Sequence, residues 1–152
     1  MEQFKLEHFV KDYPGRLFPR VDLVPTSICE EVSSEVAGRL GLSTPFDQLS
    51  LIKAIRSESG LLPAVNAETP EFNLLAVLTQ CGLPIPDHVY LDWSRFEALD
   101  RMSTVDVSEF FEYVWHPAAE DLEIIPVDIS WILSVAHSGE AFLLLLSQRH
   151  QN

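Results

Sequence analysis

The side chains best suited to chemistry gather between Trp115 and Asp128, with His137 a little further along the chain. Imidazole and carboxylate groups serve as metal ligands and as general acids and bases. One hypothesis is therefore an enzyme, a small hydrolase or a metal-dependent protein, that uses His116, Asp121 and His137. However, no two histidines have the i, i+4 spacing of a helical zinc motif, and no serine lies in a nucleophile elbow. The sequence therefore gives no basis for assigning a catalytic residue, a metal ligand or a cofactor.

The same stretch is also suited to binding another protein. Tryptophan offers a large contact area at a low entropic cost, and carboxylates around it attract a cationic partner and pair with its Arg and Lys side chains. This interpretation requires exposed side chains but no ligand geometry, and we favour it over the enzyme. The predicted partner-binding residues are Trp115, Glu120, Asp121, Glu123 and Asp128.

Charge is distributed unevenly along the chain, and this bears on the kind of partner. Residues 1–56 hold seven Lys and Arg against eight Asp and Glu, whereas residues 57–148 hold two basic residues against fifteen acids; the formal net charge is −13. An acidic surface repels phosphate backbones and anionic lipids, and it attracts cationic proteins. We therefore expect a basic protein partner and no binding to nucleic acid or to a membrane.

Some of the acids have a local explanation. Glu97, Asp106 and Glu109 belong to expected helix starts, where a carboxylate stabilises the helix whatever the partner is. For this reason the predicted contact patch leaves these three residues out and keeps the acids between Glu120 and Asp128.

Length and composition indicate one globular domain over residues 1–152, because 47% hydrophobic and 22% charged residues are typical of a chain with a packed core. The N-terminus lacks the basic start and apolar run of a signal peptide, and the apolar stretch Ala141 to Leu146 is too short to cross a bilayer. We therefore expect a cytoplasmic protein, with Cys29 and Cys81 buried and reduced.

The elements that must position these residues are mostly helical in the first two thirds of the chain. There, apolar residues recur at helical spacing after cap residues and before glycines. Residues 1–25 suggest an irregular segment with a short helix or an edge strand around Phe4 to Val10, and His88 to Asp92 suggests a strand. The expected helices begin at Thr26, Thr44, Thr69, Ser94 and Asp106.

The last third changes to the sequence pattern of strands. We expect strands at Leu122 to Val127, Trp131 to His137 and Ala141 to Ser147, with the turn at Ser138 and Gly139 joining the last two in a hairpin. Both faces of this hairpin are apolar, so it is either central in the sheet or covered on one face by a second copy, as in a structural homodimer. The sequence thus predicts an α+β fold, with a helical N-terminal two thirds packed on a C-terminal antiparallel sheet of three to four strands.

The tryptophan-containing segment also carries a resemblance. Trp115-His116-Pro117, Asp121, Trp131-Ile132-Leu133 and His137-Ser138-Gly139 resemble a pattern of small bacterial proteins of the immunity type, which neutralise toxins. The resemblance covers residues 115–139 and implies an acidic α+β protein of the cytosol that works by occluding a toxin. The leading hypothesis is therefore a non-enzymatic, cytosolic protein-binding module that neutralises a cationic toxin.

Overall fold

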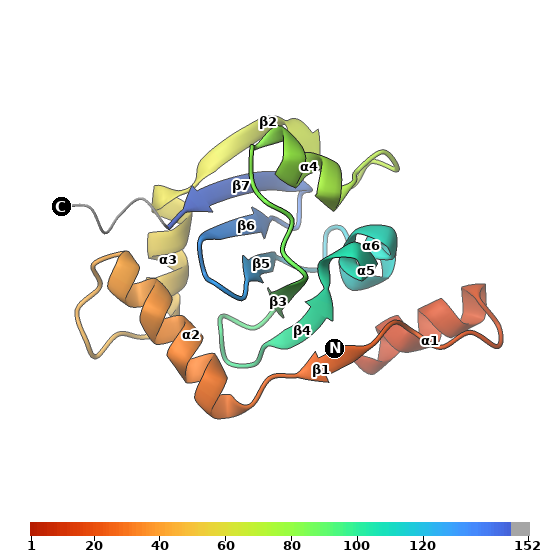
Figure 1. Cartoon of the computed structure of the whole chain (residues 1–152), viewed down its shortest axis with the longest axis horizontal. Coiled ribbons are helices and arrows are strands. Elements are labelled where there is room, and N and C mark those ends of the chain that lie inside the picture. The colour runs from red at the N-terminus through yellow and green to blue at the C-terminus, as the bar shows by residue number, and fades with distance from the viewer. Residues whose placement is uncertain (147–152) are drawn as a thin grey trace.

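Residues 1–146, which the computed structural model describes, form six helices and one antiparallel sheet of seven strands. The strands lie in the order β1-β4-β3-β5-β6-β7-β2 (Figure 1). In chain order the elements are α1 (Gln3–Asp12), β1 (Val21–Leu23), α2 (Thr26–Arg39), α3 (Gln48–Glu58), β2 (Gly60–Asn66), α4 (Leu74–Gln80), β3 (His88–Asp92), β4 (Asp100–Ser103), α5 (Thr104–Glu109), α6 (Phe111–Val114), β5 (Leu122–Pro126), β6 (Trp131–Val135) and β7 (Glu140–Leu145). Ser147, the expected end of the last strand, lies outside the described residues.

The expected C-terminal sheet of three to four strands is wrong, because the sheet has seven strands and β1, β2 and β3 come from the first two thirds of the chain, with β4 at the start of the last third. Strand β1 has only three residues and pairs with β4, while β2 contains Pro63 and pairs with β7 through an irregular register. Neither strand shows the regular alternation on which strand prediction depends. Their partners lie far away in the sequence, so the pairing that makes them strands leaves no local pattern.

The helix expected to start at Ser94 is also absent. Asp92, at the end of β3, accepts hydrogen bonds from the backbone N–H groups of Ser94 and Phe96, each at 2.9 Å. Arg95 and Phe96 have positive φ angles of 57° and 66°, so the chain turns sharply and returns as β4. Pairing of β4 with β1 on one side and β3 on the other outweighs the helical signal of the segment.

The helix expected from Asp106 is divided into α5, which begins at Thr104, and α6. The other expected helices are present, two of them with later starts. Helix α3 begins after Asp47, whose carboxylate accepts the backbone N–H of Ser50 at 2.7 Å, and not at Thr44. Helix α4 begins after Asn73 and not at Thr69. In both cases an Asp or Asn close to the apolar stripe caps the helix, because its short side chain reaches the free N–H groups of the first turn.

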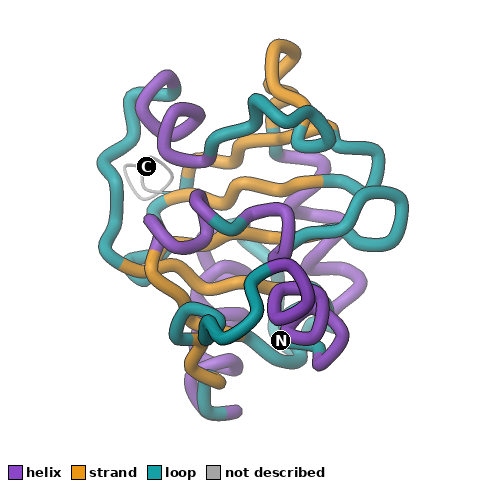
Figure 2. The backbone as a smooth tube through the Cα atoms, turned by 90° about the vertical axis from the view of Figure 1, so that its right-hand side faces the viewer, coloured by secondary structure: helices purple, strands orange, loops and turns teal. Residues whose placement is uncertain are grey.

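Helices cover both faces of the sheet (Figures 1 and 2). Helices α2 and α3 pack on one face over residues such as Ile125 and Ile132, and α4, α5 and α6 pack on the other over Ile124 and Leu133. The hairpin of β6 and β7 lies inside the sheet, between β5 and β2, so both of its apolar faces are covered within one chain. The reason for expecting a homodimer is thereby removed, although dimerisation itself stays a prediction.

Helix α1 occupies the segment for which the sequence allowed a helix or an edge strand. It packs against α6 through Phe9, whose ring contacts Phe110 and Tyr113 at centroid distances of 5.5 and 5.3 Å. Lys5, on the same helix, is only 1% exposed. A lysine buried to this extent requires a specific partner, and its partner lies in the segment singled out by the sequence.

Two further expectations concern membranes and cysteines. Within residues 1–146, no helix has the length and apolar character needed to cross a membrane. Cys29 is buried as expected, whereas Cys81 is only partly buried, and both are free thiols.

Candidate functional site

The predicted contact patch begins in the loop between α6 and β5. Trp115 is 2% exposed, and its indole N–H donates a hydrogen bond to the backbone carbonyl of Glu120 at 2.9 Å. Ala118 has a positive φ of 64° and donates its backbone N–H to the carbonyl of His137 at 2.7 Å. These bonds hold the loop closed on itself and against the turn between β6 and β7.

The carboxylate of Glu120 has a partner inside the protein. The ammonium group of Lys5 lies 2.9 Å from Glu120 Oε1, donates to the backbone carbonyl of Val114 at 2.9 Å and lies 4.0 Å from the centre of the Trp93 ring. Burial lowers the pKa of Lys5, and Glu120 opposes this effect by favouring the charged ammonium. Glu120 therefore anchors α1 to the loop.

Asp121 joins two basic side chains. Its carboxylate accepts a hydrogen bond from Arg56 at 2.6 Å and one from the backbone N–H of His137 at 2.8 Å, and it lies 3.0 Å from His137 Nδ1. Burial acts to raise the pKa of Asp121, but the hydrogen bonds from His137 and Arg56 together outweigh it and lower the pKa. Two residues of the enzyme hypothesis are thus in contact.

His116, the third residue of that hypothesis, packs against α1 instead. Its ring lies 5.1 Å from the ring of Phe4 and 6.0 Å from that of His8, and its Nδ1 is 3.9 Å from a carboxylate oxygen of Glu120. Burial lowers the pKa of His116. In the described part of the chain, no group of three His, Cys, Asp or Glu side chains is arranged to hold a metal ion. Of the three residues in the enzyme hypothesis, the structure therefore brings together only Asp121 and His137. An enzymatic activity stays a prediction.

The last two predicted contact residues differ sharply in their surroundings. Glu123 is 4% exposed and accepts the hydroxyl of Ser134, and burial raises its pKa to about 7. Asp128 is exposed and closes its own turn by accepting the hydroxyl of Ser130 at 2.7 Å. The five predicted residues therefore do not form one exposed patch, since Trp115 and Glu123 are buried and the others have partners within the chain.

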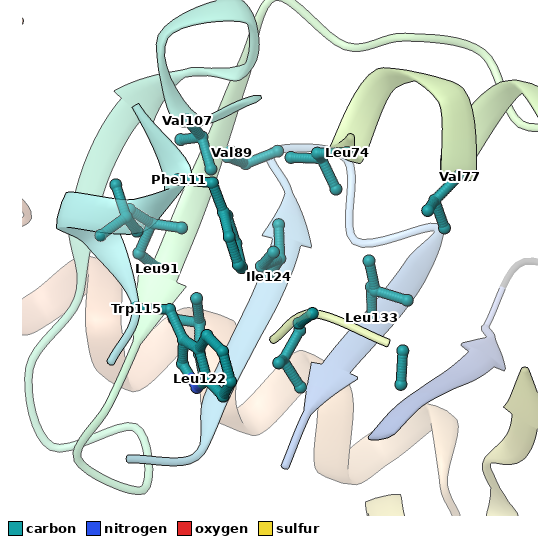
Figure 3. Close-up of a cluster of buried hydrophobic side chains, with 14 of the residues drawn as sticks. Leu74, Val77, Val89, Leu91, Val107, Phe111, Trp115, Leu122, Ile124 and Leu133 are labelled. Carbon is teal, nitrogen blue, oxygen red and sulfur yellow. The ribbon is translucent and has the colours of Figure 1, made fainter. Parts of the chain in front are cut away.

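A cavity of about 440 Å³ opens beside Trp115, between the α5–α6 segment and the chain that follows β2. Its aromatic wall consists of Phe72, Phe111 and Trp115. The ring centroids of Phe72 and Phe111 are 4.5 Å apart, and Phe111 stacks on Trp115 at 6.0 Å. Figure 3 shows Phe111 and Trp115 projecting together toward β5 residues of the core. We call this cavity the Trp115 pocket.

Three exposed glutamates, Glu68, Glu109 and Glu112, line the Trp115 pocket, and its lining contains no Lys or Arg. None of the three forms an ion pair with any residue of the described chain. Free carboxylates beside aromatic rings form surroundings that suit an ammonium or guanidinium group.

Sequence reasoning missed these glutamates for two reasons. Glu109 was attributed to a helix start, whereas it is the last residue of α5. Glu68 comes from a distant part of the chain and is placed by the turn at Gly139, which has a φ of 90° and where an added Cβ would lie 2.9 Å from Glu68 Cγ. The i, i+4 spacing of Phe111 and Trp115 was the available signal for the pocket wall.

Comparison with protein-family models, with curated proteins and with solved structures finds no match for this chain.

Proposed function

We propose that the protein is a non-enzymatic binding module that docks on a basic protein through the Trp115 pocket. The observation that supports this proposal is the presence, in one cavity, of an aromatic wall and three glutamates without an ion pair among residues 1–146. A guanidinium or ammonium group there gains charge-assisted hydrogen bonds from the carboxylates, and its hydrocarbon part can pack beside Phe72, the partly exposed ring of the aromatic wall. An arginine or lysine side chain of the partner supplies such a group.

The acidity of the whole chain also favours binding to a basic protein. A formal net charge of −13 attracts a basic protein from a distance, which makes association fast and sensitive to salt. The resemblance of residues 115–139 to immunity-type proteins makes a cationic toxin, such as a nuclease, the class of partner that we propose. In this mechanism the module acts in the cytosol and occludes the basic groove where the toxin would hold phosphates.

The test removes three charges at the pocket and compares the result with three charges removed elsewhere. In the pocket variant, all three pocket glutamates are replaced by glutamine. The control variant carries Glu7→Gln, Glu30→Gln and Glu31→Gln, which neutralises exposed acids of α1 and α2 and gives the same net charge. The probe is a hexa-arginine peptide, with binding measured by calorimetry at low and at physiological salt.

We expect the pocket variant to bind the peptide about tenfold more weakly than the wild type, equivalent to about 1.4 kcal/mol. The control variant should lose less than about threefold, because its charges act only over a distance that salt screens. The indole N–H signal of Trp115 should shift on titration of the wild type. Equal weakening of both variants, or binding without a shift of the Trp115 signal, would show that peptide binding depends only on the net charge of the protein. Either result would overturn the proposal.

A further inference from the structure

A second cavity, of about 290 Å³, lies at the C-terminal end of α3, on the sheet face that α2 and α3 cover. The strand register places Glu123 of β5 beside Ser134 of β6, and Ser134 beside Phe142 of β7. A cavity of this volume suits a small molecule. We call it the Glu123 cavity; its main lining residues are Asp121, Glu123, Ser134, His137, Glu140 and Phe142.

Glu123 is a buried carboxylate that lacks an ion-pair partner within the described residues. Its side chain lines the cavity although the residue is only 4% exposed. Its Oε2 accepts the hydroxyl of Ser134, but its Oε1 accepts no hydrogen bond from any residue between 1 and 146. On the other side, the neighbouring position of β3 is Asp92, a second buried carboxylate. Burial of a carboxylate is unfavourable unless positive charge or donor groups compensate for it.

The positive groups around the cavity are engaged with another residue. Arg56 lies at the cavity with 56% of its side chain exposed, and it pairs with Asp121 at 2.6 Å. His137 also contacts Asp121. Within the described residues neither Glu123 nor Glu140 forms an ion pair, although the charge of Arg56 acts to lower the pKa of Glu123. Three carboxylates therefore line the cavity against one guanidinium, which leaves room for a further positive charge.

We propose that the Glu123 cavity binds a small organic cation, an ammonium or guanidinium compound. Its N–H groups would donate to the free oxygen of Glu123 and to Glu140, and its hydrocarbon part would lie against the ring of Phe142. An organic cation fits better than a metal ion, because in the described residues no three His, Cys, Asp or Glu side chains, those of this cavity included, are arranged to hold a metal ion. This site is separate from the Trp115 pocket and does not depend on the proposed function.

The pH dependence of binding follows from the groups that face Glu123. Burial raises the pKa of Glu123 to about 7, and a cation binds the ionised carboxylate, so binding strengthens as the pH rises through this range. Burial raises the pKa of Asp92 to about 6, and its protonation at lower pH acts in the same direction because it makes the surroundings of Glu123 less negative. The charged and titratable groups around Glu123 are Arg56 on α3, Asp92 on β3, Asp121 just before β5, His137 after β6 and Glu140 on β7. Glu2, Arg95 and Glu120 line an adjoining hollow that Glu123 also borders.

The experiment titrates the protein with butylammonium chloride and ethylguanidinium chloride, with butanol as a neutral control. Binding is followed by amide chemical shifts, and the affected residues identify the site. The test variant is Glu123→Gln, which removes the charge and keeps an acceptor for Ser134. The matched control is Asp128→Asn, which removes an exposed charge just beyond β5 and outside the cavity.

For the wild type we expect saturable shifts at residues 121–123 and 134–138 with both cations and none with butanol. Glu123→Gln should weaken binding about tenfold and remove most of its pH dependence, whereas Asp128→Asn should change it less than about twofold. Glu140→Gln, at an exposed position, provides a second variant that is expected to keep its fold and to bind more weakly. The pocket variant of the previous section should bind these cations as the wild type does, which keeps the two proposals distinguishable. Unchanged binding in Glu123→Gln, or shifts spread over all exposed acids, would overturn the proposal.

Discussion

At the scale of single residues, the acids that the sequence singles out have several different roles. Glu120 and Asp121 are held in ion pairs, while Glu123 is a buried acid whose pKa lies at about 7. Asp92 is a similar case, with a pKa raised to about 6 by burial and only partly lowered by the hydrogen bonds from its own turn. A raised pKa of a buried acid has a direct effect on stability.

Glu123 is expected to make the free energy of unfolding depend on pH. Its ordinary pKa is 4.5 and its pKa in the folded protein is about 7, so the folded state binds more protons between these values. The contribution of Glu123 to stability is therefore present below pH 4.5 and is lost as the pH rises through about 7. The loss amounts to roughly 3 kcal/mol. We expect Glu123→Gln to raise the urea midpoint above neutral pH and to flatten the stability profile across this range.

Urea unfolding at a series of pH values provides the measurement, with Asp128→Asn as the control because that carboxylate is exposed. The control should follow the wild-type profile. A Glu123→Gln profile as steep as the wild type would contradict the raised pKa of Glu123.

At the scale of elements, helix α1 is joined to the rest of the protein by a polar contact as well as by aromatic packing. The buried pair of Lys5 and Glu120 lies between α1 and the loop that precedes β5. This ion pair joins two residues that are 115 positions apart in the sequence.

Removal of the Lys5 charge should weaken the attachment of α1. Lys5→Met leaves the carboxylate of Glu120 without its cation in a position that is only 12% exposed. We expect the free energy of unfolding to fall by about 3 kcal/mol, and amide protons of α1 to exchange faster with solvent. The double variant Lys5→Met, Glu120→Gln should recover part of the loss, because it no longer buries an unpaired charge. If the double variant is no more stable than the single one, the ion pair is not the cause of the loss.

The sequence predicts an element well where the signal is periodic and local. Helices α2 and α3 follow from apolar residues at helical spacing, and β3, β5, β6 and β7 follow from apolar runs that both faces of the sheet bury. Strand β4 could not be predicted, since its segment carries helix-start residues and becomes a strand only through pairing with β1 and β3. Glu68 in the Trp115 pocket is a similar case, because only the fold brings it beside Glu109 and Glu112.

At the scale of the whole molecule, the net charge of −13 has to be divided between internal and external roles. The ion pairs of Glu120 and Asp121 and the burial of Glu123 assign part of it to the interior. The glutamates of the Trp115 pocket belong to the part that faces solvent. Exposed charges of one sign repel each other and oppose compaction.

Salt should therefore stabilise the protein. Potassium chloride screens the repulsion between exposed carboxylates, so the melting temperature should rise by a few degrees between low and physiological ionic strength. The pocket variant with three glutamines should show a smaller rise, because it lacks three of the repelling charges. Thermal unfolding followed by circular dichroism measures both; a wild-type melting temperature independent of salt would contradict self-repulsion.

The pairing of β2 with β7 has a consequence for the order in which the protein can assemble. Among the strands of residues 1–146, β2 is hydrogen-bonded to β7 alone, and β7 is the last to leave the ribosome. During synthesis, β2 and the segment after it, which includes Glu68, therefore stay unpaired until β3 to β6 and then β7 have emerged. Completion of the sheet edge, and with it of the Trp115 pocket, is therefore expected to be a late and non-local event of folding. The nascent chain should acquire its capacity to bind a basic partner only once β7 is available.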